Sequence, residues 1–214
     1  MESPLKEQWL ALVRRYGADE RIAEAWFAQL DKRYSAAGRH YHTLAHIEAI
    51  LAAVEAHADT LADADAVRFA AWFHDAIYQP MRSDNELRSA QLAEKALSQL
   101  GFPASRLSAV RELILRTKNH TERLTGESDD LAFFLDCDLA VLGADEAQYQ
   151  RYAAQIRQEY RMFPDFLYNP GRVKVLQQFL AVPHLYRTPF FLSTFEAPAR
   201  RNLAAELSNL TRKP

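Results

Sequence analysis

The sequence predicts an all-α protein, and three observations support this prediction. Glycine and proline are scarce, with 6 and 9 copies in 214 residues. Most of them lie between stretches in which apolar residues recur every three or four positions, the spacing of a helix that buries one stripe. Hydrophobic residues make up 49% of the chain, which is enough for a continuous core. We therefore expect one helical domain over residues 1–214 rather than two independent domains.

The ends of several helices are marked by their residue types. Pro80 cannot continue a helix and ends the helix expected at 63–77. The run from Ser83 to Glu86 has the form of a capping box, and the helix that it opens ends at Gly101, a residue suited to a left-handed cap. Residues 182–198 contain three prolines and several aromatics, so we expect a loop packed over the core. Helices are expected at 5–16, 19–36, 43–57, 63–77, 83–100, 104–118, 129–142, 145–161, 170–181 and 195–210.

Charge and composition exclude several classes of partner. The formal net charge is −2, so no overall field draws the chain onto a polyanion, and nucleic acid is not expected as a bulk partner. No basic segment leads into an apolar one at the start, and no apolar run approaches the roughly 18 residues of a membrane span. The single cysteine, Cys137, cannot form an internal disulfide. These features predict a cytoplasmic protein without a membrane partner, and they leave its oligomeric state open.

Three separate stretches offer side chains that bind metals: Arg39-His-Tyr-His42-Thr-Leu-Ala-His46, Trp72-Phe-His74-Asp75 and Leu135-Asp136-Cys-Asp138. His42 and His46 are four residues apart, so near a helix start they project from one face. The adjacent pair His74 and Asp75 stands in an apolar frame, where a carboxylate needs a compensating cation or partner. Asp136 follows an apolar run and has the same need. One divalent ion would compensate both carboxylates.

Such a ligand set has a typical chemistry. Two imidazoles and two carboxylates leave positions open on a six-coordinate ion for water and for a substrate oxygen. The ion makes water easier to deprotonate and polarises the electrophilic centre that the water attacks. The pattern therefore predicts hydrolysis.

Five frames, in the order in which they occur, resemble the HD superfamily of metal-dependent phosphohydrolases, and one bacterial branch of it in particular. They are Arg-x-Tyr-His-x-x-x-His, Trp-Phe-His-Asp, Asn-Glu-x-x-Ser-Ala, Thr-Lys-x-His and Asp-x-Asp-Leu. The resemblance covers roughly residues 34–160 and implies an HD-like helical core there, with helical extensions before it and over 161–214. It also implies a divalent ion held by His46, His74, Asp75 and Asp136, and a phosphomonoesterase or phosphodiesterase acting on a small phosphorylated substrate such as a nucleotide.

Two residues are candidates for acid or base catalysis, each with a structural alternative. His42 precedes the first ligand by four, as does the proton-donating histidine of the cyclic-nucleotide phosphodiesterases, which share this architecture. His42 is therefore a general acid or, alternatively, a helix cap or a residue that supports a metal ligand. Glu86 follows the His-Asp pair closely enough to act as a base on the water, yet its spacing from Ser83 also suits a reciprocal cap.

Four further residues complete the predicted site. Arg39 either neutralises a substrate phosphate or is a solvated charge at a helix end. Lys118 and His120 either end a helix, where cations suit the helix dipole, or bind the substrate phosphate or a second metal, since related two-metal members use a histidine in a comparable place. Asp136 is preferred to Asp138 as the ligand, and Asp138 is expected to hold a histidine through a hydrogen bond.

The identity of the metal and two other functions stay open. Nothing in the sequence ranks manganese, magnesium, iron, nickel, cobalt or zinc, and a second ion is an alternative. The chain could instead be a metal-containing sensory protein that binds a nucleotide without cleaving it. An oxygen-dependent di-iron enzyme is less favoured, because only His120 offers an obvious extra imidazole.

Overall fold

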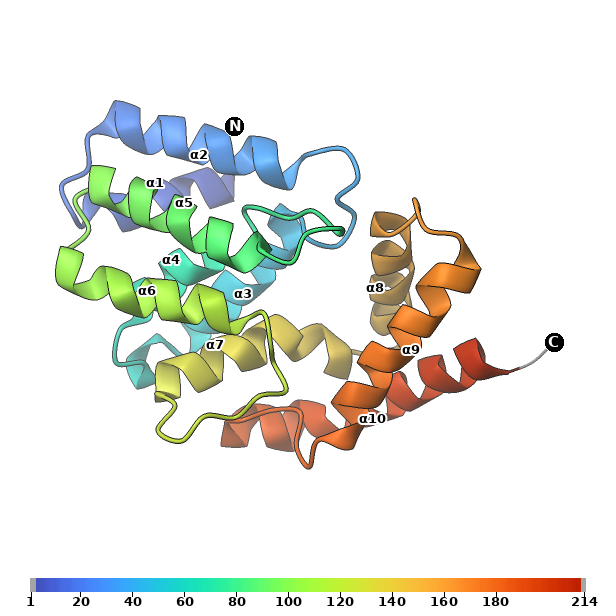
Figure 1. Ribbon diagram of the computed structural model, residues 1–214. Coiled ribbons are helices and arrows are strands. Elements are labelled where there is room, and N and C mark those ends of the chain that lie inside the picture. Colours follow the sequence, from blue (N-terminus) through green and yellow to red (C-terminus); the bar gives the residue numbers. More distant parts are fainter. Residues whose placement is uncertain (1–2, 213–214) are drawn as a thin grey trace. The chain divides into compact units, whose positions relative to one another are not determined.

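The computed structural model describes residues 3–212, and this range contains helices and no strand, which confirms the all-α prediction (Figure 1). The chain forms two compact units, residues 1–118 and 119–214, called here the first and the second unit. That the whole chain forms a single HD-like domain stays a prediction. Within the described residues, none of the helices combines the length and the apolar character needed to cross a bilayer.

The first unit is built around one buried helix. Its elements are α1 (Pro4–Arg14), α2 (Glu20–Tyr34), α3 (Leu44–Ala56), the short 3₁₀ helix η1 (Ala58–Thr60), α4 (Ala64–Phe73), α5 (Asn85–Gln99) and α6 (Ala104–Arg116). Helix α4 packs against α3, α5 and α6, while α1 pairs with α2. Apolar side chains lie on every side of α4, as expected for a buried helix. The ring of Trp9 packs edge-on against Trp72 at 5.4 Å and against Phe69 at 6.2 Å.

The predicted left-handed cap at Gly101 is confirmed. Its φ is +78°, and a Cβ at this position would lie 2.5 Å from the carbonyl oxygen of Tyr16. Glycine is therefore required here both for the backbone conformation and for the close approach of the segment at Tyr16.

The capping box predicted at the start of the next helix is wrong. Helix α5 begins at Asn85, and its N-cap is Asp84, whose side chain makes no capping hydrogen bond. The carboxylate of Asp84 instead accepts two hydrogen bonds from Arg82, at 2.7 and 2.6 Å. Ser83 thus lies outside the cap, and the reciprocal bond to Glu86 does not form.

Helix α4 ends at Phe73, four residues before the end predicted at Ile77. Side chains from elsewhere in the unit bind the backbone groups that another helical turn would have used. Arg39 donates to the carbonyls of Asp75 and Ala76, and the amide of Ile77 donates to the hydroxyl of Ser89, at 3.0 Å. This early end matters because His74 and Asp75 follow directly.

The second unit comprises α7 (Asp129–Leu139), the 3₁₀ helix η2 (Ala140–Gly143), α8 (Glu146–Glu159), α9 (Asp165–Ala181) and α10 (Pro189–Thr211). Helix α10 packs against α9 and η2. The contact with η2 is tight, since a Cβ at Gly143 would lie 2.6 Å from the carbonyl oxygen of Phe195. Any larger residue at Gly143 would push the two elements apart.

Two predicted boundaries in this unit are wrong. Helix α9 begins at Asp165 rather than 170, and α10 begins at Pro189 rather than 195, so the loop is 182–188 instead of 182–198. Pro189 occupies the first turn, where the missing N–H costs nothing, and Pro198 lies inside the helix at the loss of one backbone hydrogen bond. Prolines marked the segment as irregular, but a long helix with a buried face tolerates them.

Candidate metal centre

Three of the four predicted metal ligands come together in the first unit. His46 lies in the first turn of α3, His74 is the C-cap of α4, and Asp75 is the next residue. One donor atom from each lies within 4.8 Å of the others. Both histidines are buried and Asp75 is half-buried.

The spacing of the donor atoms fits a shared ion. The two Nε2 atoms of His46 and His74 are 3.3 Å apart, and Nε2 of His74 is 3.1 Å from Oδ2 of Asp75. Two ligands that each lie about 2.1 Å from an ion are about 3.0 Å apart at a right angle and about 3.4 Å apart at the tetrahedral angle. The observed separations fall in this interval.

The tautomer of His74 also suits a ligand. Its Nδ1 lies 3.0 Å from the carbonyl oxygen of Ala71, and because a carbonyl can only accept, Nδ1 carries the proton. The lone pair of the neutral ring is then on Nε2, which faces His46 and Asp75. A bond from the other ring nitrogen to a backbone carbonyl is the arrangement that fixes the ring orientation in metal sites.

His42 lies beside this cluster, just before the N-cap of α3, Thr43. Its Nε2 is 3.8 Å from Oδ2 of Asp75, and its ring centroid is 5.9 Å from that of His46. The ring lies against Tyr78 at 4.3 Å, with the two planes 31° apart. Thr43 makes no side-chain cap, and His42 stands at the edge of the donor set, where an acid or base can reach a group bound there.

Arg39 is engaged with the protein backbone. It donates to the carbonyl oxygen of His42 at 2.9 Å, to that of Asp75 at 2.7 Å and to that of Ala76 at 3.2 Å. These bonds join the segment that leads into α3 to the segment that follows α4. The predicted contact of Arg39 with a substrate phosphate stays a prediction.

Glu86 and two neighbours belong to the first turns of α5. Within the described chain, the side chain of Glu86 makes no hydrogen bond or ion pair, so its role as a cap is removed and its role as a base stays a prediction. Asn85 binds the amide and the carbonyl of Gln79 at 3.1 and 2.9 Å. Ser89 binds the amide of Ile77. Asn85 and Ser89 were not predicted as site residues, although both belong to the Asn-Glu-x-x-Ser-Ala frame, which was their only signal in the sequence.

Lys118 is exposed at the end of the first unit, and its Nζ donates to the carbonyl oxygen of Ser83. This bond ties the chain after α6 to the loop before α5. Binding of substrate phosphate by Lys118 stays a prediction.

Asp136 is fully buried in the second unit and accepts four hydrogen bonds there. The amide of Arg187 reaches both carboxylate oxygens, at 2.8 and 3.0 Å, and Thr188 donates its amide at 2.7 Å and its hydroxyl at 2.9 Å. Burial raises the pKa of the Asp136 carboxyl, while the bonds from Thr188 and Arg187 act in the opposite direction. These partners were not predicted, because 187–188 lay in a segment expected to be a loop over the core.

His120 and Asp138 form a pair in the second unit. Nε2 of His120 lies 2.8 Å from Oδ2 of Asp138, and both side chains are largely buried. The histidine that lies beside Asp138 is thus His120, and a role of Asp138 in supporting a metal ligand stays a prediction. Binding of phosphate or of a second ion by His120 stays a prediction.

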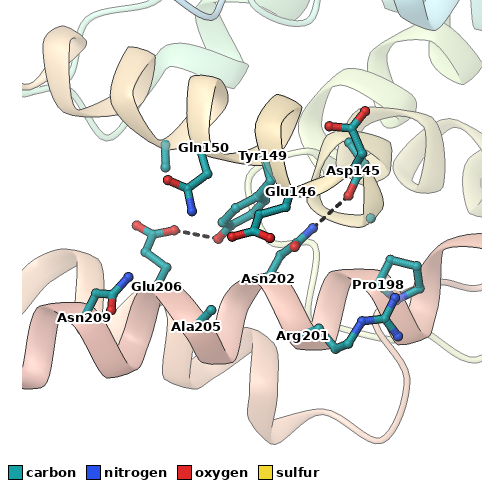
Figure 2. Close-up of a pocket in the computed structure, with 13 residues that line it drawn as sticks. Asp145, Glu146, Tyr149, Gln150, Pro198, Arg201, Asn202, Ala205, Glu206 and Asn209 are labelled. Carbon is teal, nitrogen blue, oxygen red and sulfur yellow. Dashed lines mark hydrogen bonds between the residues drawn. The ribbon is translucent and has the colours of Figure 1, made fainter.

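A pocket of about 560 Å³ lies between α8 and α10 of the second unit, and none of the predicted site residues lines it (Figure 2). Three of its polar side chains have partners within the second unit. Tyr149 donates to Glu206 at 2.5 Å, Arg172 donates to the same carboxylate at 2.7 and 2.9 Å, and Asn202 donates to the carbonyl oxygen of Ala144. Tyr149, Glu206 and Asn202 of the lining are therefore already paired within the second unit.

Comparison of the chain with known protein families, with curated proteins and with solved structures found no match. The case for a function therefore depends on the residues of this chain.

Proposed function

We propose that this chain is a metal-dependent phosphohydrolase whose ion is held by His46, His74 and Asp75. The observation that carries the proposal is the spacing of the three donors, 3.3 Å between the imidazole nitrogens and 3.1 Å from imidazole to carboxylate. The Nδ1 bond of His74 to a backbone carbonyl supports it, because that bond aims the lone pair at the other donors. Asp136 as a fourth ligand is carried by the resemblance in sequence alone.

A divalent ion in such a site makes water a better nucleophile and polarises the phosphoryl group. The protein supplies the other parts. His42, next to Asp75, is placed to give a proton to the leaving oxygen, and Glu86, which has no partner among the described residues, is suited to take a proton from the attacking water. The ordered frames that resemble the HD superfamily favour a phosphorylated substrate, such as a nucleotide.

The first experiment measures metal content and activity together. Purified protein is analysed for its elements and then screened against phosphorylated metabolites in the presence of the metal found. We expect at least one ion per chain and release of phosphate or a phosphoester product. His74→Ala and Asp75→Ala should lose both, whereas His184→Ala, which removes an exposed imidazole, should keep both.

Other outcomes identify the rival functions. Protein without stoichiometric metal, or full activity in His74→Ala, would contradict the proposal. A metal-loaded protein that cleaves nothing but is thermally stabilised by a nucleotide would be a binding protein. Two irons per chain together with oxygen-dependent activity would indicate an oxidase.

A second variant tests the role of the acid or base. Glu86→Gln should lower kcat by about 100-fold or more, the range for loss of a general base, and leave the free energy of unfolding unchanged, because Glu86 bonds to no described residue. A loss of stability with unchanged kcat would instead assign Glu86 a structural role.

A further inference from the structure

Arg39 lies in the connection between α2 and α3, and its charged side chain binds backbone carbonyl groups. Its guanidinium uses two nitrogens to reach three carbonyl oxygens that belong to two separate segments. One segment, at His42, leads into the helix that carries His46. The other, at Asp75 and Ala76, follows the helix that ends at His74.

Two aromatic rings hold the guanidinium in place. Its central carbon lies 4.9 Å from the ring centroid of Tyr34 and 5.4 Å from that of Tyr78. Tyr34 is itself fixed, since it is buried and its hydroxyl donates to the carbonyl oxygen of Trp72 at 2.9 Å. The ring of Tyr78 also contacts His42. Arg39 is thus supported by α2 and by the segment after α4.

The bonds of Arg39 explain why the donors meet. The carbonyl groups of Asp75 and Ala76 lie just past the end of α4, and Arg39 donates a hydrogen bond to each of them. By binding the carbonyls of Asp75 and Ala76, Arg39 stabilises the early end of α4, which turns the side chain of Asp75 toward His74. By binding the carbonyl of His42, it fixes the entry to α3.

We infer that Arg39 is a positioning residue that holds the segments bearing His46, His74 and Asp75 in register for metal binding, rather than a ligand of the substrate phosphate. The inference rests on the proposed metal site. Lysine has the same charge but a single nitrogen, so it cannot reach both segments with a planar fork. The two roles therefore predict different measurements for Arg39→Lys.

The test compares the full-length wild type with Arg39→Lys and with Arg21→Lys, a matched change at an exposed arginine of α2. The dissociation constant for Mn²⁺ or Co²⁺ is measured calorimetrically on metal-free protein, well below the unfolding temperature of each variant. We expect Arg39→Lys to bind the ion about 10- to 100-fold more weakly, as for loss of a group that orients metal ligands. Arg21→Lys should bind it as the wild type does. At saturating metal, Arg39→Lys should recover kcat with an unchanged KM.

The outcomes separate this inference from the proposed function. Wild-type protein that binds no ion removes the metal site itself. Wild-type affinity in Arg39→Lys overturns the inference, and a raised KM with that affinity assigns Arg39 to the phosphate. If Arg39→Lys does not fold, Tyr78→Leu and Tyr78→Phe replace it. Loss of the ring should weaken metal binding, and retention of the ring should preserve it, whereas equal affinities would overturn the inference.

Discussion

Asp75 and Asp136 satisfy the same electrostatic need in two different ways. Both carboxylates stand in apolar sequence frames, and each predicted a compensating cation. Asp75, in the first unit, faces two imidazoles whose donor atoms could share an ion with it. Asp136, in the second unit, is more deeply buried, yet it receives four hydrogen bonds from Arg187 and Thr188. A carboxylate among apolar residues thus indicates that a partner exists without identifying it.

The two carboxylates therefore do not indicate a metal equally. At Asp136 the backbone and a hydroxyl supply much of what a cation would supply, so its burial alone no longer requires an ion. At Asp75 the donor atoms of two imidazoles lie within 4.8 Å of a carboxylate oxygen, and imidazole and carboxylate are both ligands of divalent metals. The first unit therefore holds the stronger indication of a metal.

The largest expected effect on stability is at Asp136. Asp136→Ala leaves the amides of Arg187 and Thr188 and one hydroxyl without their acceptor, and each such loss costs about 1–3 kcal/mol. We expect the free energy of unfolding of the metal-free protein to fall by about 4 kcal/mol, measured by urea denaturation. Asp136→Asn keeps one acceptor oxygen and should lose less. A metal-free Asp136→Ala protein as stable as the wild type would show that these bonds contribute little.

At Asp75 we expect a small effect on stability and a large effect on metal binding. Asp75→Asn removes the negative charge of a proposed ligand. We expect the affinity for the metal to fall by about 100-fold or more, because loss of a group that only orients ligands already lowers it by up to about 100-fold. The free energy of unfolding of the metal-free protein should change by less than about 1 kcal/mol, because asparagine keeps the size of the side chain and one acceptor oxygen. Calorimetric titration and urea denaturation of the same preparation provide both numbers. Equal losses of stability in Asp75→Asn and Asp136→Asn would remove the contrast between the two carboxylates.

A smaller effect is expected at Ser89, which supports the segment after the metal ligands. Ser89→Ala leaves the amide of Ile77 without its acceptor and should cost about 1–2 kcal/mol. Ser98 on the same helix is exposed and bonds only to a carbonyl of the preceding turn, so Ser98→Ala is the matched control and should be nearly neutral. Thermal unfolding of both variants compares them. A neutral Ser89→Ala would mean that water replaces the hydroxyl at this amide.

The sequence predicted the helices of this chain well because helix formation depends on local periodicity. The helix at 43–57 and the cap at Gly101 follow from residues within a few positions of each other, and both were confirmed. The end of α4 was missed because Arg39 and Ser89, distant in sequence, bind the backbone there. The start of α10 was missed because tertiary packing outweighed the signal of Pro198.

In the candidate site, too, features that depend on residue type were predicted and features that depend on distant contacts were missed. Residue types and order were enough to single out His46, His74 and Asp75, whose donors do come together. The hydrogen-bond partners of Asp136 and the contacts of Arg39 could not be predicted, because nothing local in the sequence encodes which distant backbone group a side chain will meet. The hydrogen-bond partners of a charged side chain are thus harder to predict from the sequence than the charged residue itself.

The smallest expected effect concerns a second pair of His and Asp. In the first unit the Nε2 of His74 faces both a carboxylate and another imidazole, whereas in the second unit the Nε2 of His120 faces Asp138 at 2.8 Å. His120→Asn should therefore cost only about 1 kcal/mol of stability, the net value of one hydrogen bond, and leave the number of bound ions per chain unchanged. Elemental analysis of the wild type and the variant checks the second expectation. Loss of one metal equivalent in His120→Asn would instead make the two pairs alike and support the predicted second ion.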